Sequence, residues 1–231
     1  MKPLVIRSRI DLLLVFRRFF LLSTIFLVLH ICGQIGIYFF GASRDWLGVL
    51  NMDHEYNLPT LFSASLMAAS GCLLRLLSDY KESRLRNDFI WFSWIMYFVA
   101  FDELFQVHEI LIIPSLWSYL PPALYSTWVI PYSFAALFVL IRLRFLLLSL
   151  SAVHRRAFLV SALVFVSGAI GMEVVASFLV RTHLISMHSF YYGFIAGVEE
   201  YLEMLGVIFF LRSLTRLLLS YCGRVSVELS I

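Results

Sequence analysis

The chain has 231 residues, of which 61% are hydrophobic and 14% are charged, with a formal net charge of +3. Soluble domains are about 45–50% apolar and about 25% charged, so this composition excludes an ordinary soluble domain. The small positive charge calls for no nucleic-acid partner, because basic loops on one side of a membrane account for it.

Six apolar runs are long enough for membrane-spanning helices, which need about 20 residues each. They cover residues 19–41, 59–78, 89–113, 123–147, 157–180 and 189–215. The first run is longer than the apolar part of a signal peptide, and no small-residue cleavage site follows it, so we interpret it as a retained helix. We therefore predict an all-α fold over residues 1–231, a single transmembrane domain formed by a bundle of six helices.

Lysine and arginine residues segregate to one side of these six spans. All but two of the 18 fall in the N-terminal segment, the second and fourth loops and the C-terminal tail, and the two exceptions are Arg44 and Arg181. The positive-inside rule then predicts that both termini are cytoplasmic. Aromatic residues near the opposite end, including Trp117, Tyr125, Trp128 and Tyr192, are interpreted as an interfacial belt.

Seven carboxylates fall inside the predicted spans. They are Asp102, Glu103 and Glu109 in the third, Glu173 in the fifth, and Glu199, Glu200 and Glu203 in the sixth. Each charge at the centre of a bilayer costs about 2.5–3.5 kcal/mol, and no lysine or arginine lies in the middle of a span to pair with them. The acids must therefore be protonated or bound to a cation, and such groups are candidates for a functional site.

Helical spacing predicts which of these acids share a face of a helix. At 100° per residue, Asp102, Gln106 and Glu109 share one face of the predicted third helix, whereas His108 points away from it. Counting along the helices places the acids between the middle of the membrane and its outer face. We therefore predict a site that opens to the extracytoplasmic side, with external residues at its mouth, namely Asp53, His54, Glu55, His183 and His188.

Carboxylates together with histidines suit divalent Fe, Mn or Zn. The predicted metal ligands are Glu103, His108, Glu109, Glu173, Glu199, Glu200 and Glu203. Asp102 is the candidate catalytic proton acceptor or the partner of a ligand. A bound ion could activate water, so we expect a metal-binding protein, plausibly a metalloenzyme, that acts on a lipid-borne or periplasmic substrate.

Two alternatives remain open. A column of acids can relay protons or cations in a transporter, although the sequence shows no inverted repeat of the kind many carriers contain. The chain could also be an accessory subunit of a membrane complex. The expected partners are thus membrane lipids, with a membrane protein or a second copy of the chain as further possibilities.

Three segments carry a resemblance to a known family: EYNLPTLFS at 55–63, FDELFQVHE at 101–109 and VEEYLEMLG at 198–206. The chain resembles an uncharacterised family of bacterial multipass membrane proteins with the patterns E-x-N-x-P-[TS]-x-x-S and D-E-x-x-x-x-H-E. The resemblance implies a location in the bacterial cytoplasmic (inner) membrane, and it implies no known activity. It also implies that Glu55 and Asn57 belong to the same site as Asp102, Glu103, His108 and Glu109.

Overall fold

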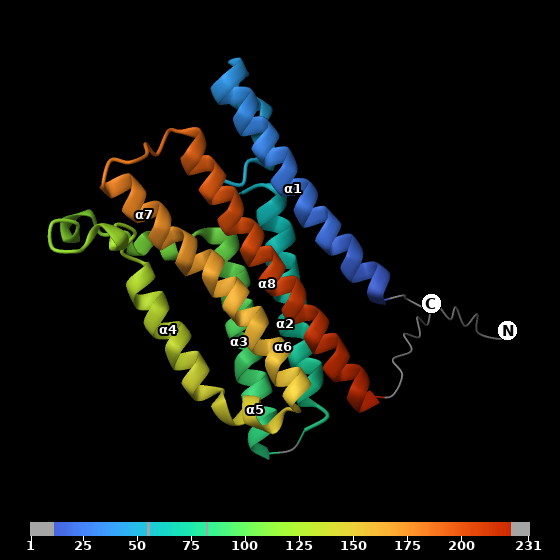
Figure 1. The fold of residues 1–231 in the computed structure, drawn as a ribbon. Coiled ribbons are helices and arrows are strands. Elements are labelled where there is room, and N and C mark those ends of the chain that lie inside the picture. The colour runs from blue at the N-terminus through green and yellow to red at the C-terminus, as the bar shows by residue number, and fades with distance from the viewer. Residues whose placement is uncertain (1–11, 55, 82, 223–231) are drawn as a thin grey trace.

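The computed structural model describes residues 12–54, 56–81 and 83–222, and over these ranges the protein is all-helical (Figure 1). Of the predicted site residues, Glu55 lies outside the described ranges. Helices occur in all six of the predicted apolar runs. Their bounds are α1 (Leu12–Phe40), α2 (Leu58–Ser78), α3 (Ser83–Phe105), α4 (Val129–Arg142), α5 (Arg144–Ser149), α6 (Ala152–Val166), α7 (Glu173–Arg181) and α8 (Phe190–Cys222).

Membrane-spanning character is clearest for three helical segments of the described chain. Leu12–Phe40, Leu58–Ser78 and Ala152–Arg181 are each long and apolar enough to cross a membrane, and Val129–Arg142 is a shorter apolar helix. The third of these segments is α6 and α7 joined by a π-helix, η6 (Ser167–Met172). A membrane protein is therefore indicated, and the six-span topology remains a prediction.

Successive long helices run in opposite directions, so the connections alternate between the two ends of the bundle (Figure 1). The described residues of the segments 41–57, 106–128 and 182–189 lie at the same end, which we call the loop end. The beginning of α1 and the end of α8 lie at the other end. This arrangement agrees with the segregation of basic residues, since Arg44 and Arg181 are both at the loop end.

The hydrophobic core lies in the half of the bundle away from the loop end. It is formed by α2, α3, α5, α6 and α8, and its most buried side chains include Met67, Leu74, Leu77, Phe89, Leu146 and Leu214. The rings of Phe158 on α6 and Phe210 on α8 meet edge to face with 5.1 Å between their centroids. Apolar packing therefore fills this half, which leaves the polar residues for the loop end.

Glycines bring α8 into backbone contact with α6 and η6. A Cβ atom added to Gly206 would lie 2.6 Å from the backbone nitrogen of Phe165, and one added to Gly168 would lie 2.8 Å from the carbonyl oxygen of Glu199. Small residues allow such close approach between membrane helices. The contact at Gly168 fixes the part of α8 that carries the acidic residues.

The third helix ends at Phe105, eight residues before the predicted end at 113. Gln106 has a φ of 54°, and the chain continues in short 3-10 turns, η3 (His108–Leu111) and η4 (Pro114–Leu116). A further turn, η5 (Pro122–Leu124), replaces the predicted start of the fourth helix, which begins at Val129. Pro131 lies in the first turn of α4, where proline is tolerated.

Candidate functional site

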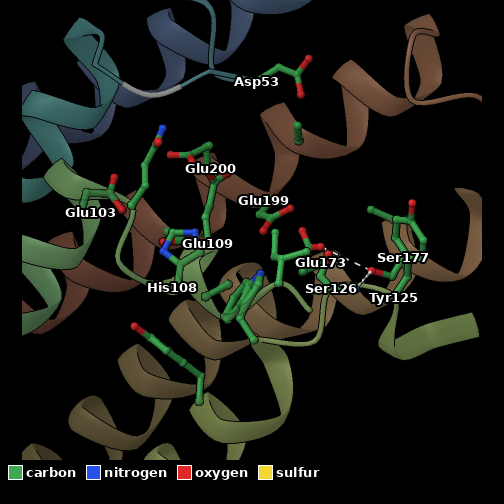
Figure 2. A pocket seen from close by; sticks show the side chains of 18 of the residues that line it. Asp53, Glu103, His108, Glu109, Tyr125, Ser126, Glu173, Ser177, Glu199 and Glu200 are labelled. Carbon is green, nitrogen blue, oxygen red and sulfur yellow. Dashed lines mark hydrogen bonds between the residues drawn. The ribbon is translucent and has the colours of Figure 1, made fainter. Parts of the chain in front are cut away.

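A cavity of about 590 Å³ lies at the loop end, between α3, α4, α7, α8 and the connecting segments. It gathers all the predicted intramembrane site residues, namely Asp102, Glu103, His108, Glu109, Glu173, Glu199, Glu200 and Glu203. Figure 2 shows several of these side chains around the cavity, with Asp53 beside them. With Asp53, eight carboxylates line the cavity, and no lysine or arginine lines it within the described ranges.

Asp102 and His108 form a close pair although α3 ends between them. The Asp102 carboxylate accepts hydrogen bonds from the backbone N–H of His108 at 2.8 Å and from its ring Nδ1 at 3.2 Å. The imidazole also packs against Trp128, with 4.9 Å between the ring centroids. The expectation that His108 points away from the acids was wrong, because it assumed a continuous helix through Gln106.

Glu103 provides a buried oxygen that lacks a hydrogen bond. Its Oε1 atom is enclosed, and no hydrogen-bond partner reaches it from the described residues. The hydroxyl of Ser63 lies close to this carboxyl group. A buried polar atom without a partner costs about 1–3 kcal/mol, so this oxygen is suited to an additional ligand.

Glu173 and Glu199 face each other from α7 and α8 (Figure 2). The Ser177 hydroxyl donates to Glu173 Oε1 at 3.4 Å, and it accepts a hydrogen bond from the backbone N–H of Ser126 at 3.1 Å. Glu199 interacts electrostatically with four other carboxylates, those of Glu173, Glu200, Asp53 and Glu103. Several like charges therefore share one partly enclosed space.

Asp53 belongs to the 41–57 segment and lies outside the predicted spans. Burial raises the pKa of this carboxyl group above its ordinary value, and the nearby charges of His54, His188 and Arg44 lower it in part. His54 lines the cavity together with Asp53. The predicted mouth residues His183 and His188 are exposed and do not line it, although His188 lies close enough to interact with Asp53.

Asn57 has a structural role at the start of α2. Its Oδ1 accepts a hydrogen bond from the backbone N–H of Thr60 at 2.8 Å, and its Nδ2 donates to the carbonyl oxygens of Asn51 and His54. These contacts cap the helix and shape the 51–57 segment that positions Asp53. Asn57 therefore supports the cavity without lining it.

His30 on α1 is also structural. It is fully buried, its Nδ1 accepts a hydrogen bond from the backbone N–H of Met52 at 3.1 Å, and its Nε2 lies 2.8 Å from the carbonyl oxygen of Gly193. The Nδ1 contact requires an acceptor, so Nε2 carries the proton and donates to Gly193. His30 thus joins α1, the 41–57 segment and α8 behind the cavity.

Some lining residues were not predicted as part of the site. Trp117, Tyr125, Trp128 and Tyr192 were interpreted only as an interfacial belt, and Ser126, Tyr132 and Ser177 were not singled out. Tyr132 follows Trp128 by one helical turn, so the two rings meet edge to face at 5.3 Å. Helical spacing after Trp128 could have found Tyr132, whereas nothing in the sequence marks the two serines.

A preformed metal centre is absent from the described residues. No three His, Cys, Asp or Glu side chains among them converge closely enough to hold an ion in the conformations observed. The carboxylate and imidazole donors are of the type that Fe, Mn and Zn accept. A metal ion would therefore require the carboxylates that line the cavity to adopt other rotamers than those observed.

A family model for a domain of unknown function, DUF8692, matches residues 15–217. The chain belongs to the DUF8692 family. The match includes every residue that lines the cavity and confirms the uncharacterised family expected from the resemblance, whereas its motifs and bacterial membrane setting remain predictions. No curated protein and no solved structure matches the chain.

Proposed function

We propose that this DUF8692 protein crosses the membrane six times, with cytoplasmic termini, and binds a divalent metal ion in a cavity open to the extracytoplasmic side. The observation that carries the proposal is the lining of the cavity, which has eight carboxylates and no lysine or arginine among the described residues. The segregation of basic residues supports the orientation, because the loop end has few of them.

The electrostatics of this lining require that its negative charges be neutralised. Like charges in a medium of low dielectric constant repel each other far more strongly than in water. The carboxylates must therefore take up protons or share a cation. A divalent ion neutralises two carboxylates at once, and the unpartnered Oε1 of Glu103 offers it a first ligand.

The inner side of the cavity is the best place for the ion. Figure 2 shows Glu103, His108, Glu109 and Glu200 together on one side of the pocket. Glu103, His108, Glu200 and Glu203 would hold the ion, with Glu109, Glu173 and Glu199 as further carboxylates. Asp102 would fix the orientation of the His108 ring, as carboxylates commonly do for metal-ligating histidines.

Bound Fe, Mn or Zn supplies Lewis acidity that polarises a water molecule or a substrate oxygen. The chain would then act as a metalloenzyme on a lipid-borne or periplasmic substrate. Its own residues would orient that substrate, and Asp102 would accept a proton at the wall of the cavity. The aromatic rings of Trp128 and Tyr132 lie against the ring of His108, which pairs with Asp102.

Cation transport is the second candidate, and one feature favours it. The π-helix η6 directly precedes Glu173, and π-helices inside α-helices are frequent at functional sites. The apolar core argues against a transport path, because it fills the half of the bundle away from the cavity. An accessory role with a membrane partner predicts copurification of a second chain.

Elemental analysis of the detergent-purified protein tests the proposal. Wild type should contain about one or two equivalents of Fe, Mn or Zn, as mononuclear and two-metal sites do. The double variant Glu103→Gln/Glu203→Gln should lose most of this metal. The matched control is Asp45→Asn/Asp79→Asn, which removes two carboxylates that do not line the cavity and should keep the metal.

Folded wild type that stays metal-free after growth with supplied Fe, Mn and Zn would contradict the proposal. Proton or cation flux into liposomes would then support the transporter, provided that Glu203→Gln abolishes the flux.

A further inference from the structure

The cavity is much larger than a metal ion requires. Its volume of about 590 Å³ is in the range of small-molecule sites, which span about 300–1,000 Å³. Aromatic residues form part of its wall, and Trp117 and Tyr125 stack with 4.2 Å between their ring centroids. This space is suited to an organic group, which under the proposed function would belong to the substrate.

Charge is divided between the interior of the cavity and its rim. The interior has the carboxylates, including Glu173, Glu199 and Asp53. The two basic residues of the loop end, Arg44 and Arg181, are exposed and lie beside lining residues. The Arg181 guanidinium is 6.0 Å from the centroid of the Tyr125 ring, and Arg44 interacts electrostatically with Asp53.

Trp117 adds a hydrogen-bond donor on the aromatic wall. Its indole N–H is buried, and within the described ranges no acceptor reaches it. Buried polar atoms normally have partners, so an unsatisfied donor in a cavity wall indicates a ligand atom that accepts a hydrogen bond. The carboxylates of the cavity repel anions. The indole N–H is therefore the feature of this wall that favours a ligand with a hydrogen-bond acceptor.

We propose that the cavity binds a phosphoethanolamine group, with its primary ammonium among Glu173, Glu199 and Asp53 and its phosphate at the rim near Arg181 and Trp117. An ammonium group has three N–H donors for carboxylate oxygens. A phosphate accepts charge-assisted hydrogen bonds from arginine and a further bond from the indole N–H. This inference rests on the proposed function, because it names the substrate class of the same site.

The division of charge gives the ligand one orientation. A zwitterion with its ammonium inward and its phosphate outward matches the interior and the rim together, whereas the reverse orientation places like charges in contact. A choline group has no N–H donors and should bind more weakly. Glycerol headgroups have no positive charge and should be rejected. The group can come from an aminophospholipid or from free phosphoethanolamine.

Native mass spectrometry of the full chain, stripped of metal by a chelator, measures lipid retention. Wild type should retain phosphatidylethanolamine in preference to phosphatidylcholine and phosphatidylglycerol. Glu199→Gln and Arg181→Ala should each weaken this binding about tenfold or more, because each removes a charge-assisted contact. The controls Asp45→Asn and Arg75→Ala should leave it unchanged, since neither residue lines the cavity.

Free phosphoethanolamine, tested by thermal shift, separates the two sources. If it stabilises wild type but phosphatidylethanolamine shows no preferential retention, the ligand is the soluble group. Equal retention of phosphatidylcholine together with no stabilisation by free phosphoethanolamine overturns the proposal, and so does full binding by both Glu199→Gln and Arg181→Ala. Glu173→Gln replaces Glu199→Gln if the latter does not elute as a folded protein in size-exclusion chromatography.

The metal content of the same preparations, measured before stripping, keeps this inference separate from the proposed function. Headgroup binding by a protein that never contained metal would refute the metal site alone. Metal content with neither preferential phosphatidylethanolamine retention nor stabilisation by free phosphoethanolamine would refute this inference alone.

Discussion

The carboxylate of Asp102, in the last turn of α3, holds both the backbone N–H and the ring Nδ1 of His108. One side chain thus ends a helix and orients the imidazole that follows it. Asp102 is itself buried, with 6% of its surface exposed, so water competes little for these bonds. The pair is the best-defined polar contact of the cavity.

Asp102→Asn should lower metal affinity about 10–100-fold, the usual cost of losing the partner of a ligating histidine. The reason is that the neutral amide no longer favours a proton on Nδ1, so the ring loses its fixed tautomer. Competition with a coloured chelator measures the affinity, and Asp79→Asn is the control. Unchanged affinity would show that His108 is not a ligand oriented by Asp102.

Two glycines of the same π-helix should respond differently to alanine. At Gly168 the new Cβ would meet the backbone of Glu199 and Glu203 at 2.8 and 3.0 Å, whereas at Gly171 the nearest atom is 3.9 Å away. Gly168→Ala should therefore destabilise the protein by about 1–3 kcal/mol, the usual cost of overpacking. Gly171→Ala is the matched control. Thermal unfolding in detergent measures both, and equal midpoints would contradict the packing of η6 on α8.

The ion pair between Asp88 and Arg142 should contribute strongly to stability. Arg142 Nη1 lies 2.5 Å from Asp88 Oδ1, and the Asp88 side chain is completely buried. Arg142→Ala leaves that charge buried without its partner, at a cost of about 2 kcal/mol or more. Asp88→Asn/Arg142→Ala should recover part of the loss. Denaturation midpoints test this, with Arg144→Ala as the control, and a midpoint for Arg142→Ala equal to wild type would refute it.

Asp53 should make stability depend on pH. Because burial raises the pKa of Asp53, the folded protein holds this proton more tightly than the unfolded chain does. Its contribution is therefore present below the ordinary aspartate pKa of about 3.9 and is lost as pH rises through the higher folded value. The side chain in Asp53→Asn cannot ionise, so this variant does not lose this contribution to stability as pH rises.

Melting curves of wild type and Asp53→Asn across pH test this sign. The variant should be the more stable protein near pH 7, and its advantage should shrink as pH falls towards about 3.9. Asp45→Asn is the control, because Asp45 is exposed. An advantage that grows on acidification would contradict the burial of Asp53.

The membership of the cavity could be predicted from the sequence. Acids as far apart as Asp102 and Glu203 were expected to share one interior site, because each is too costly to face lipid. The structure places both in the lining of one cavity. The energetic cost of exposing a carboxylate to lipid indicates which side chains must lie together in the interior. This inference does not depend on the conformation of the loops.

The local geometry could not be predicted in the same way. The apolar run continues past Phe105, so the hydropathy of the sequence does not show that the helix ends there. It predicts neither the positive φ of Gln106 nor the hydrogen bond that Asp102 accepts from the backbone N–H of His108. The direction of His108 was wrong for this reason. The aromatic wall was also missed. In the sequence, Trp117 and Tyr125 look the same whether they belong to an interfacial belt or line a binding site.

The π-helix Ser167–Met172 gives the segment Ala152–Arg181 two helical registers in one apolar run. The π-helical turn contains one more residue than an α-helical turn, which shifts the register of the helix that follows. Glu173 is the first residue of that helix, α7. A relative of this chain shorter by one residue within 167–172 would turn its α7 by about 100° relative to α6. Its counterpart of Glu173 would then point about 100° away from the direction in which Glu173 lines the cavity, so the length of this segment affects whether a carboxylate here can belong to the site.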